Sequence, residues 1–119
     1  MDWSPDQTFG VATREQIAGL SGRELLQALI DGRLPAPPIN KTMSFRLAEV
    51  ADGYCAFEGE PGPHLLNPLG GVHGGWALTL VDSAGGCAAH STLPAGVSCA
   101  TVETKGNFSR PITPRLCPP

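Results

Sequence analysis

The first regular hydrophobic pattern along the chain has the period of a helix. Four apolar residues recur three and four positions apart: Leu25, Leu26, Leu29 and Ile30. This spacing places them on one face of a helix. Ser21, followed three residues later by Glu24, forms a capping-box sequence, and Gly32 supplies a stop signal. The pattern therefore predicts a short helix over residues 22–31.

The pattern changes after the proline-rich stretch LPAPPIN at residues 34–40. Three prolines there remove backbone donors and fix φ, so this stretch is expected to be an irregular connector. From Lys41 the apolar residues alternate with polar ones, and a second such run covers 54–58. Asp52-Gly53 separates the two runs, which is typical of a β-hairpin turn. Two antiparallel strands are expected here.

The second half of the chain contains the longest apolar segment. Residues 61–71 read as a loop, and the segment from Gly74 to about Ala89 predicts a helix that is apolar on nearly every side, and therefore buried. Residues 93–96 end it. Residues 97–108 alternate again and predict a third strand. The order of elements indicates an α+β fold in which a sheet wraps one apolar helix.

Composition and charge narrow the class of protein. A chain of 119 residues with 41% hydrophobic and 16% charged residues is expected to fold as one domain. The net charge is −3 and the eight basic residues are scattered, which gives nucleic acid no binding surface. No apolar run is long enough to cross a membrane, and the N-terminus does not resemble a signal peptide, so the cytoplasm is the expected compartment.

The cysteines and histidines predict no metal site. The four cysteines contain no C-x-x-C pair and are expected to be small buried apolar residues or free thiols: Cys55, Cys87, Cys99 and Cys117. The three histidines share no ligand spacing with them or with each other: His64, His73 and His90.

The glycine-rich stretch 70–75 opens the apolar helix. It does not match the P-loop, because Trp76 stands where lysine is needed, and it does not match the dinucleotide-binding fingerprint. A plain tight turn is one interpretation. The other is that the glycines allow close approach to the backbone, so that N–H groups at the helix start hold a negatively charged oxygen.

Asp82 is the exceptional residue of the apolar helix. If the helix began at Ser83, Asp82 would be its N-cap. If the helix runs from Gly74, Asp82 is a mid-helix carboxylate with Gly85 and Gly86 one turn away, which leaves space for a ligand or a second chain. A poorly solvated carboxylate with space beside it is typical of a general base or a nucleophile.

Taken together, these residues resemble a known family. Asn67, then His73-Gly74-Gly75, then Asp82 nine residues after the histidine, and later T-V-E-x-x-x-x-F-x-R-P from Thr101 to Pro111, are similar to the hotdog-fold acyl-CoA thioesterases of the phenylacetate-pathway (PaaI) type. Taken alone, Asn67 before Pro68 would indicate a turn and His73 a structural residue.

The resemblance implies a long central helix wrapped by a curved antiparallel sheet, in a homodimer or homotetramer with active sites between subunits. In that arrangement Asp82 is the nucleophile or the general base that activates water. The Gly74 N–H polarises the thioester carbonyl with His73 beside it, Asn67 positions water or the thioester, and Thr101 assists by a hydrogen bond near Asp82. Coenzyme A is part of the substrate, so no separate cofactor is expected.

The chain departs from the family after Pro114. Members continue with further strands, whereas residues 115–119 do not resemble a strand. We expect an N-terminal extension at 1–40, a C-terminally truncated hotdog domain at 41–114 and an atypical tail at 115–119. A hotdog dehydratase is disfavoured, because its His and acid arrangement is absent. A non-catalytic acyl-CoA-binding module and an inactive fragment are the alternatives.

Overall fold

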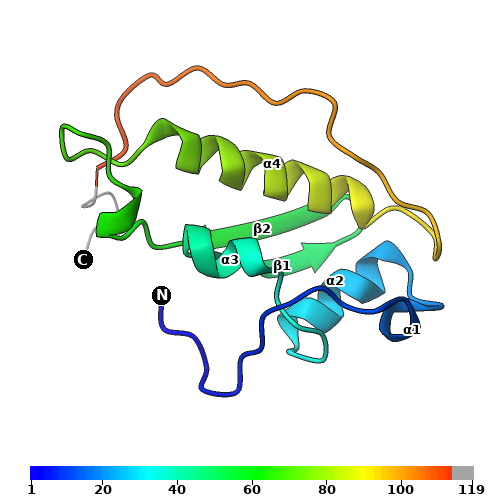
Figure 1. Ribbon diagram of the computed structural model, residues 1–119. Helices are drawn as coiled ribbons and strands as arrows, with labels where there is room; N and C mark the ends of the chain where they lie inside the picture. Colours follow the sequence, from blue (N-terminus) through cyan, green and yellow to red (C-terminus); the bar gives the residue numbers. More distant parts are fainter. Residues whose placement is uncertain (114–119) are drawn as a thin grey trace.

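A computed structural model describes residues 1–113, which form an α+β arrangement. Its elements, in chain order, are α1 (Arg14–Ile17), α2 (Gly22–Ile30), α3 (Pro38–Met43), β1 (Phe45–Ala51), β2 (Tyr54–Gly59), the 3₁₀ turn η1 (Pro63–Leu65) and α4 (Gly74–His90). The β1–β2 hairpin lies against α4, and α2 and α3 pack beside β1 (Figure 1). The expected tail at 115–119 and Cys117 lie outside the described residues.

The capping box of α2 is confirmed. Ser21 Oγ accepts a hydrogen bond from the Glu24 N–H at 3.2 Å, and Glu24 Oε1 accepts one from the Ser21 N–H at 2.9 Å. These bonds satisfy two N–H groups at the start of the helix. The helix ends at Ile30, one residue before the expected position, and Gly32 follows with a left-handed φ of 75°.

The expected connector is wrong in its second half, where α3 forms. Pro38 occupies the first turn of α3, where its missing N–H removes no helical hydrogen bond. Ser44, with φ 53°, ends the helix and redirects the chain into β1. Met43 is therefore helical rather than part of a strand. Helix α1 was not predicted from the sequence; it is a single turn that Thr13 caps as Ser21 caps α2.

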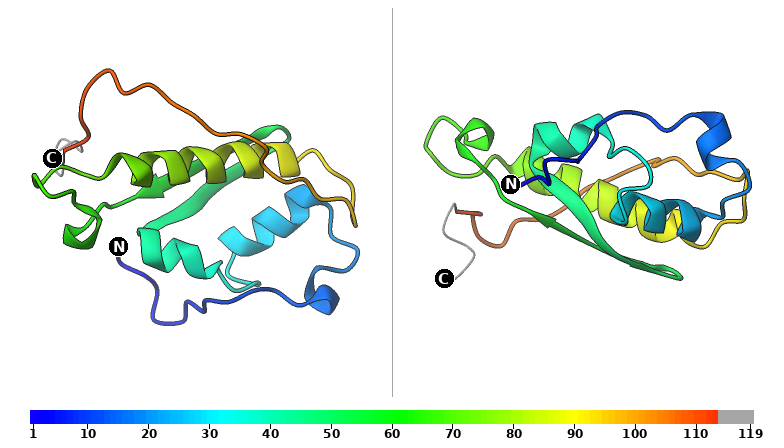
Figure 2. Two further views of the ribbon diagram at one scale, coloured as in Figure 1. Left: turned by 45° about the horizontal axis from the view of Figure 1, so that its top comes forward. Right: turned by 90° about the horizontal axis from the view of Figure 1, so that it is seen from below.

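The hairpin is confirmed with its two-residue turn. β1 and β2 are antiparallel, Ala51 pairs with Tyr54 across Asp52-Gly53, and Gly53 has a φ of 72°. A register shift between Leu47 and Glu49 marks a β-bulge. Bulges increase the local twist of a strand, which here curves β1 beside α2 and α3 (Figure 2).

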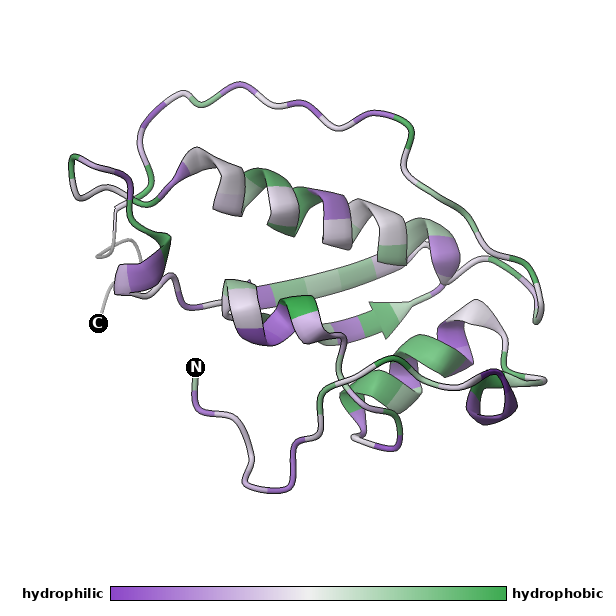
Figure 3. Cartoon of the chain, in the orientation of Figure 1, coloured by the Kyte–Doolittle hydropathy of each residue, from purple (hydrophilic) through white to green (hydrophobic). Residues whose placement is uncertain are grey.

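Helix α4 runs as expected from Gly74, but the prediction that it is buried is wrong. Trp76 is its one buried residue. The Trp76 indole donates from Nε1 to the Met43 carbonyl at 2.6 Å, and Cys55 Sγ approaches the Ala84 carbonyl at 3.0 Å. The hairpin thus covers one face of α4. Apolar positions nevertheless also lie on the side of α4 that faces the viewer in Figure 3, and Val81 is 55% exposed.

The third strand, expected over residues 97–108, is absent from the described part of the chain. This segment is extended and runs along α4 on the side away from the hairpin (Figure 1). A strand needs a neighbouring backbone to pair with its N–H and C=O groups, and α4 uses its own backbone groups internally. The sheet therefore has two strands among residues 1–113, and it contacts α4 without wrapping it.

Candidate active site

Asn67 shapes the loop that leads into α4. Its Oδ1 accepts hydrogen bonds from the N–H groups of Leu69 (2.9 Å) and Gly71 (3.1 Å), and its own N–H donates to the Gly71 carbonyl at 2.7 Å. A side chain that bonds to the backbone two residues ahead is an Asx turn. The side-chain oxygen of Asn67 is thus used within the loop, in the turn that the Asn-Pro dipeptide indicates.

His73 is the N-cap of α4. Its Nδ1 accepts a hydrogen bond from the Gly75 N–H at 2.9 Å, and its carbonyl accepts one from the Trp76 N–H at 3.0 Å. The neutral imidazole must therefore carry its proton on Nε2. Within residues 1–113 the Gly74 N–H has no acceptor. The start of α4 thus presents one N–H donor that is available to an external oxygen.

The Phe108 ring lies over the same helix start. A Cβ added to Gly74 would stand 3.4 Å from Phe108 Cζ, which is contact distance. Phe108 as a whole residue is 52% exposed. Glycine at position 74 therefore leaves space between the helix backbone and the ring.

Asp82 lies in the middle of α4, which excludes the interpretation that it caps a helix beginning at Ser83. Its Oδ1 accepts hydrogen bonds from Thr101 Oγ1 at 2.6 Å and from Thr104 Oγ1 at 3.2 Å. Asp82 is exposed, so the expectation of a poorly solvated carboxylate is wrong for this chain. The reason is that, among residues 1–113, only the segment 97–108 crosses this face of α4.

Thr104 was not identified from the sequence. In a strand, residues 101 and 104 would point to opposite faces, because side chains alternate with period two. The segment is not a strand, and both hydroxyls reach the same carboxylate oxygen. Two donors on Oδ1 restrict the rotation of the carboxylate and leave Oδ2 for another partner.

An open groove of about 670 Å³ lies beside Asp82, between α4 and residues 99–105. Gly85 and Gly86 line it, and a Cβ on either glycine would meet nothing within 4 Å. The space that was expected beside the carboxylate is therefore present.

The two halves of the expected site are separated within one chain. Gly74 and Asp82 are eight residues apart on one helix, which corresponds to about 12 Å along its axis. The structure brings Asp82 together with Thr101, and it brings His73 together with Gly74. Asn67 and His73 make no hydrogen bond with Asp82.

In the described part of the chain, no group of three His, Cys, Asp or Glu residues is arranged to hold a metal ion. Cys55, Cys87 and Cys99 are free thiols. Burial raises the pKa of the Cys87 thiol to about 11, so it is protonated at neutral pH. No helix among residues 1–113 has the length and apolarity to span a bilayer.

Helix α4 thus carries an available N–H at its start and, in its middle, a carboxylate that two threonine hydroxyls orient. A hydrolytic site can use groups of these two kinds. Residues 69–116 match the family model of the thioesterase superfamily. The match includes Gly74, Asp82 and Thr101 but not Asn67. It indicates the hotdog fold and thioester hydrolysis, and the packing of α4 on an antiparallel hairpin is consistent with that fold. Neither the curated proteins nor the solved structures yielded a significant match.

Proposed function

We propose that this protein is an acyl-CoA thioesterase of the PaaI type. The observation that carries the proposal is the position and hydrogen bonding of Asp82. Its Oδ1 is held by two threonine hydroxyls, and it lies on the helix whose first N–H is available to a substrate oxygen. Both features lie within the part of the chain that matches the thioesterase superfamily.

The chemistry requires a nucleophile and a site for the oxyanion. Asp82 attacks the thioester carbon directly, or it takes a proton from a water that attacks. In both routes the carbonyl oxygen gains negative charge, which the Gly74 N–H and the helix dipole stabilise. Collapse of the tetrahedral intermediate breaks the C–S bond and releases coenzyme A. The direct route then needs water to hydrolyse the acyl-aspartate.

A second copy of the chain would bring the two halves of the site together. The axial separation of about 12 Å prevents one carbonyl group from reaching both Gly74 and Asp82 of the same chain. If two α4 helices pair antiparallel, Gly74 of each lies near Asp82 of the other. The groove beside Asp82 and the exposed Val81 offer an open face for this pairing. We therefore propose a homodimer, or a tetramer built from two dimers.

The proposed arrangement can be tested by subunit complementation. Asp82→Asn removes the nucleophile or base, whereas Gly74→Pro removes the N–H at a helix position that accepts proline. Each variant alone is expected to be inactive. An equal mixture, unfolded and refolded together, should recover about a quarter of the wild-type thiol release, because half of the dimers contain one intact site.

The outcomes separate the alternatives. Thiol release by the wild type should be measured on short-chain, medium-chain and aryl acyl-CoAs. Absence of turnover on all of them would reject the proposal that the protein is a thioesterase. Binding without turnover would support the acyl-CoA-binding module. An active wild type without recovery in the mixture would place both groups of the site within one subunit.

The two threonines provide a graded prediction. Thr101→Val should lower kcat about tenfold with little change in KM, because a hydroxyl bond to a charged group is lost. Thr104→Val should have a smaller effect, since its hydrogen bond is longer (3.2 Å against 2.6 Å). The double variant should lose less than the product of the two effects, because both hydroxyls orient one oxygen.

The matched controls are Thr101→Ser and Thr104→Ser, which keep the hydroxyl and should retain most of the activity. Activity that is lost in the serine variants but kept in the valine variants would show that the threonine methyl groups, not their hydroxyls, matter.

A further inference from the structure

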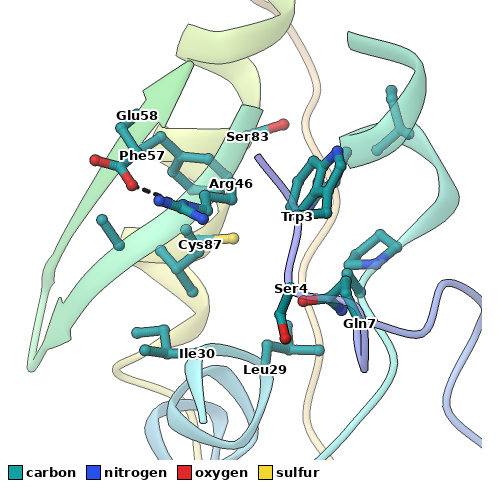
Figure 4. Close-up of a pocket in the computed structure, with 16 residues that line it drawn as sticks. Trp3, Ser4, Gln7, Leu29, Ile30, Arg46, Phe57, Glu58, Ser83 and Cys87 are labelled. Carbon is teal, nitrogen blue, oxygen red and sulfur yellow. Dashed lines mark hydrogen bonds and ion pairs between the residues drawn. The ribbon is translucent and has the colours of Figure 1, made fainter. Parts of the chain in front are cut away.

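A second cavity, here called the N-terminal cavity, lies away from Asp82. It measures about 460 Å³, is partly open to solvent, and is lined by the segment before α1, by α2, α3 and the hairpin, and by α4 (Figure 4). Six of its sixteen lining residues have aromatic or branched aliphatic side chains: Trp3, Leu29, Ile30, Ile39, Leu47 and Phe57. Its volume is in the range of small-molecule sites.

The N-terminal cavity is separated from the candidate active site by α4 itself. Ser83 and Cys87 contribute the α4 wall of the cavity, whereas Asp82 and Gly86 line the groove. At 100° per residue, Ser83 and Cys87 point about 100° and about 140° away from Asp82 around the helix axis. The cavity and the groove share no lining residue. They are different sites.

Asn40 gives the cavity a specific polar group. Its side chain lines the cavity, the residue is only 7% exposed, and its amide has no hydrogen-bond partner within residues 1–113. No fully enclosed side-chain polar atom in this range lacks a partner, so the Asn40 amide opens onto the cavity. The Asn40 amide is therefore free to pair with water or with a polar group of a bound molecule.

The wall carries no net charge. Arg46 Nε is 2.6 Å from Glu58 Oε1, so the guanidinium and the carboxylate neutralise each other (Figure 4). The Cys87 thiol is protonated, since burial raises its pKa to about 11. A charged ligand would lose hydration here without gaining an unpaired opposite charge.

We propose that the N-terminal cavity binds a compact neutral molecule, aromatic or branched aliphatic, whose single hydroxyl or carbonyl group pairs with the Asn40 amide. The apolar wall holds the body of the ligand, and Asn40 fixes its orientation. This site does not depend on the proposed thioesterase activity.

Fluorine NMR titration of the full chain provides the test. The probes are para-trifluoromethyl benzyl alcohol, the matched toluene without the hydroxyl, and the matched benzoate. The wild type should bind the alcohol saturably. Ser83→Phe should fill the cavity from α4 and weaken this binding at least about tenfold, whereas Ser98→Phe, the same change at an exposed position, should not.

Asn40→Leu tests the polar contact. It should weaken binding of the alcohol about tenfold while leaving binding of the toluene nearly unchanged. Thermal unfolding of each variant identifies any that does not fold, and Leu29→Trp then fills the cavity from α2 instead. Three results would overturn the proposal: no saturable binding to the wild type, undiminished binding when the cavity is filled, or benzoate binding as tightly as the alcohol.

Discussion

Asp82→Asn is expected to lower acyl-CoA hydrolysis by about 10³-fold or more while the protein stays folded. An amide can neither accept a proton from water at neutral pH nor attack a thioester. The substitution keeps the size of the side chain, and the amide oxygen can still accept the hydrogen bond from Thr101, which is 2.6 Å from Oδ1 in the parent. Asp82 is exposed, so the loss of its charge breaks no buried ion pair.

Thiol release and the thermal unfolding midpoint should be measured on the same preparation. Asp52→Asn is the matched control, because it removes an equal charge from the exposed hairpin turn and should leave hydrolysis unchanged. If Asp82→Asn kept more than about a tenth of the parental turnover, Asp82 would be neither nucleophile nor general base.

The features that the sequence predicted correctly depend on short-range interactions. The Ser21 capping box, the Asp52-Gly53 turn and the continuous helix from Gly74 each follow from residues within a few positions of one another. Capping and positive φ are local properties, so no tertiary contact is needed to specify them. Proline at the start of α3 was misinterpreted for a related reason: it favours a helix start as readily as a connector.

The errors concern features that depend on packing partners. Alternation over residues 97–108 describes a segment suited to a sheet, but no strand lies beside it within residues 1–113. For the same reason the apolar character of α4 did not predict its burial, since the hairpin covers only one face. The exposure of Asp82 follows from this partial cover rather than from its own neighbours in sequence.

The candidate site likewise contains features that the sequence predicted and features that it did not. The resemblance predicted a hydrogen bond near Asp82 from Thr101, and that bond is present. Thr104 was missed, because a strand would direct it to the opposite face. The roles assigned to Asn67, His73 and Gly74 remain predictions, and the complementation experiment addresses Gly74 directly.

Gly22→Ala is expected to destabilise the protein by about 2–3 kcal/mol, because the added methyl group meets backbone atoms that cannot move aside. Gly22 is buried at the start of α2, and its N–H donates to the Leu93 carbonyl at 3.0 Å. A Cβ at this position would overlap the carbonyl oxygen of His90, the last residue of α4. That oxygen also accepts the Leu93 N–H at 3.0 Å, so it cannot move aside without breaking the turn after α4.

The thermal unfolding midpoint should accordingly fall by about 10 °C. Gly85→Ala is the matched control, because it adds the same methyl group inside α4, where nothing lies within 4 Å. Alanine is a better helix former than glycine, so this control should be neutral or stabilising by up to about 1 kcal/mol. A loss of stability in Gly22→Ala without a loss in Gly85→Ala would show that the steric constraint lies in the contact between α2 and the end of α4. An unchanged midpoint for Gly22→Ala would mean that α2 does not pack against the end of α4 in solution.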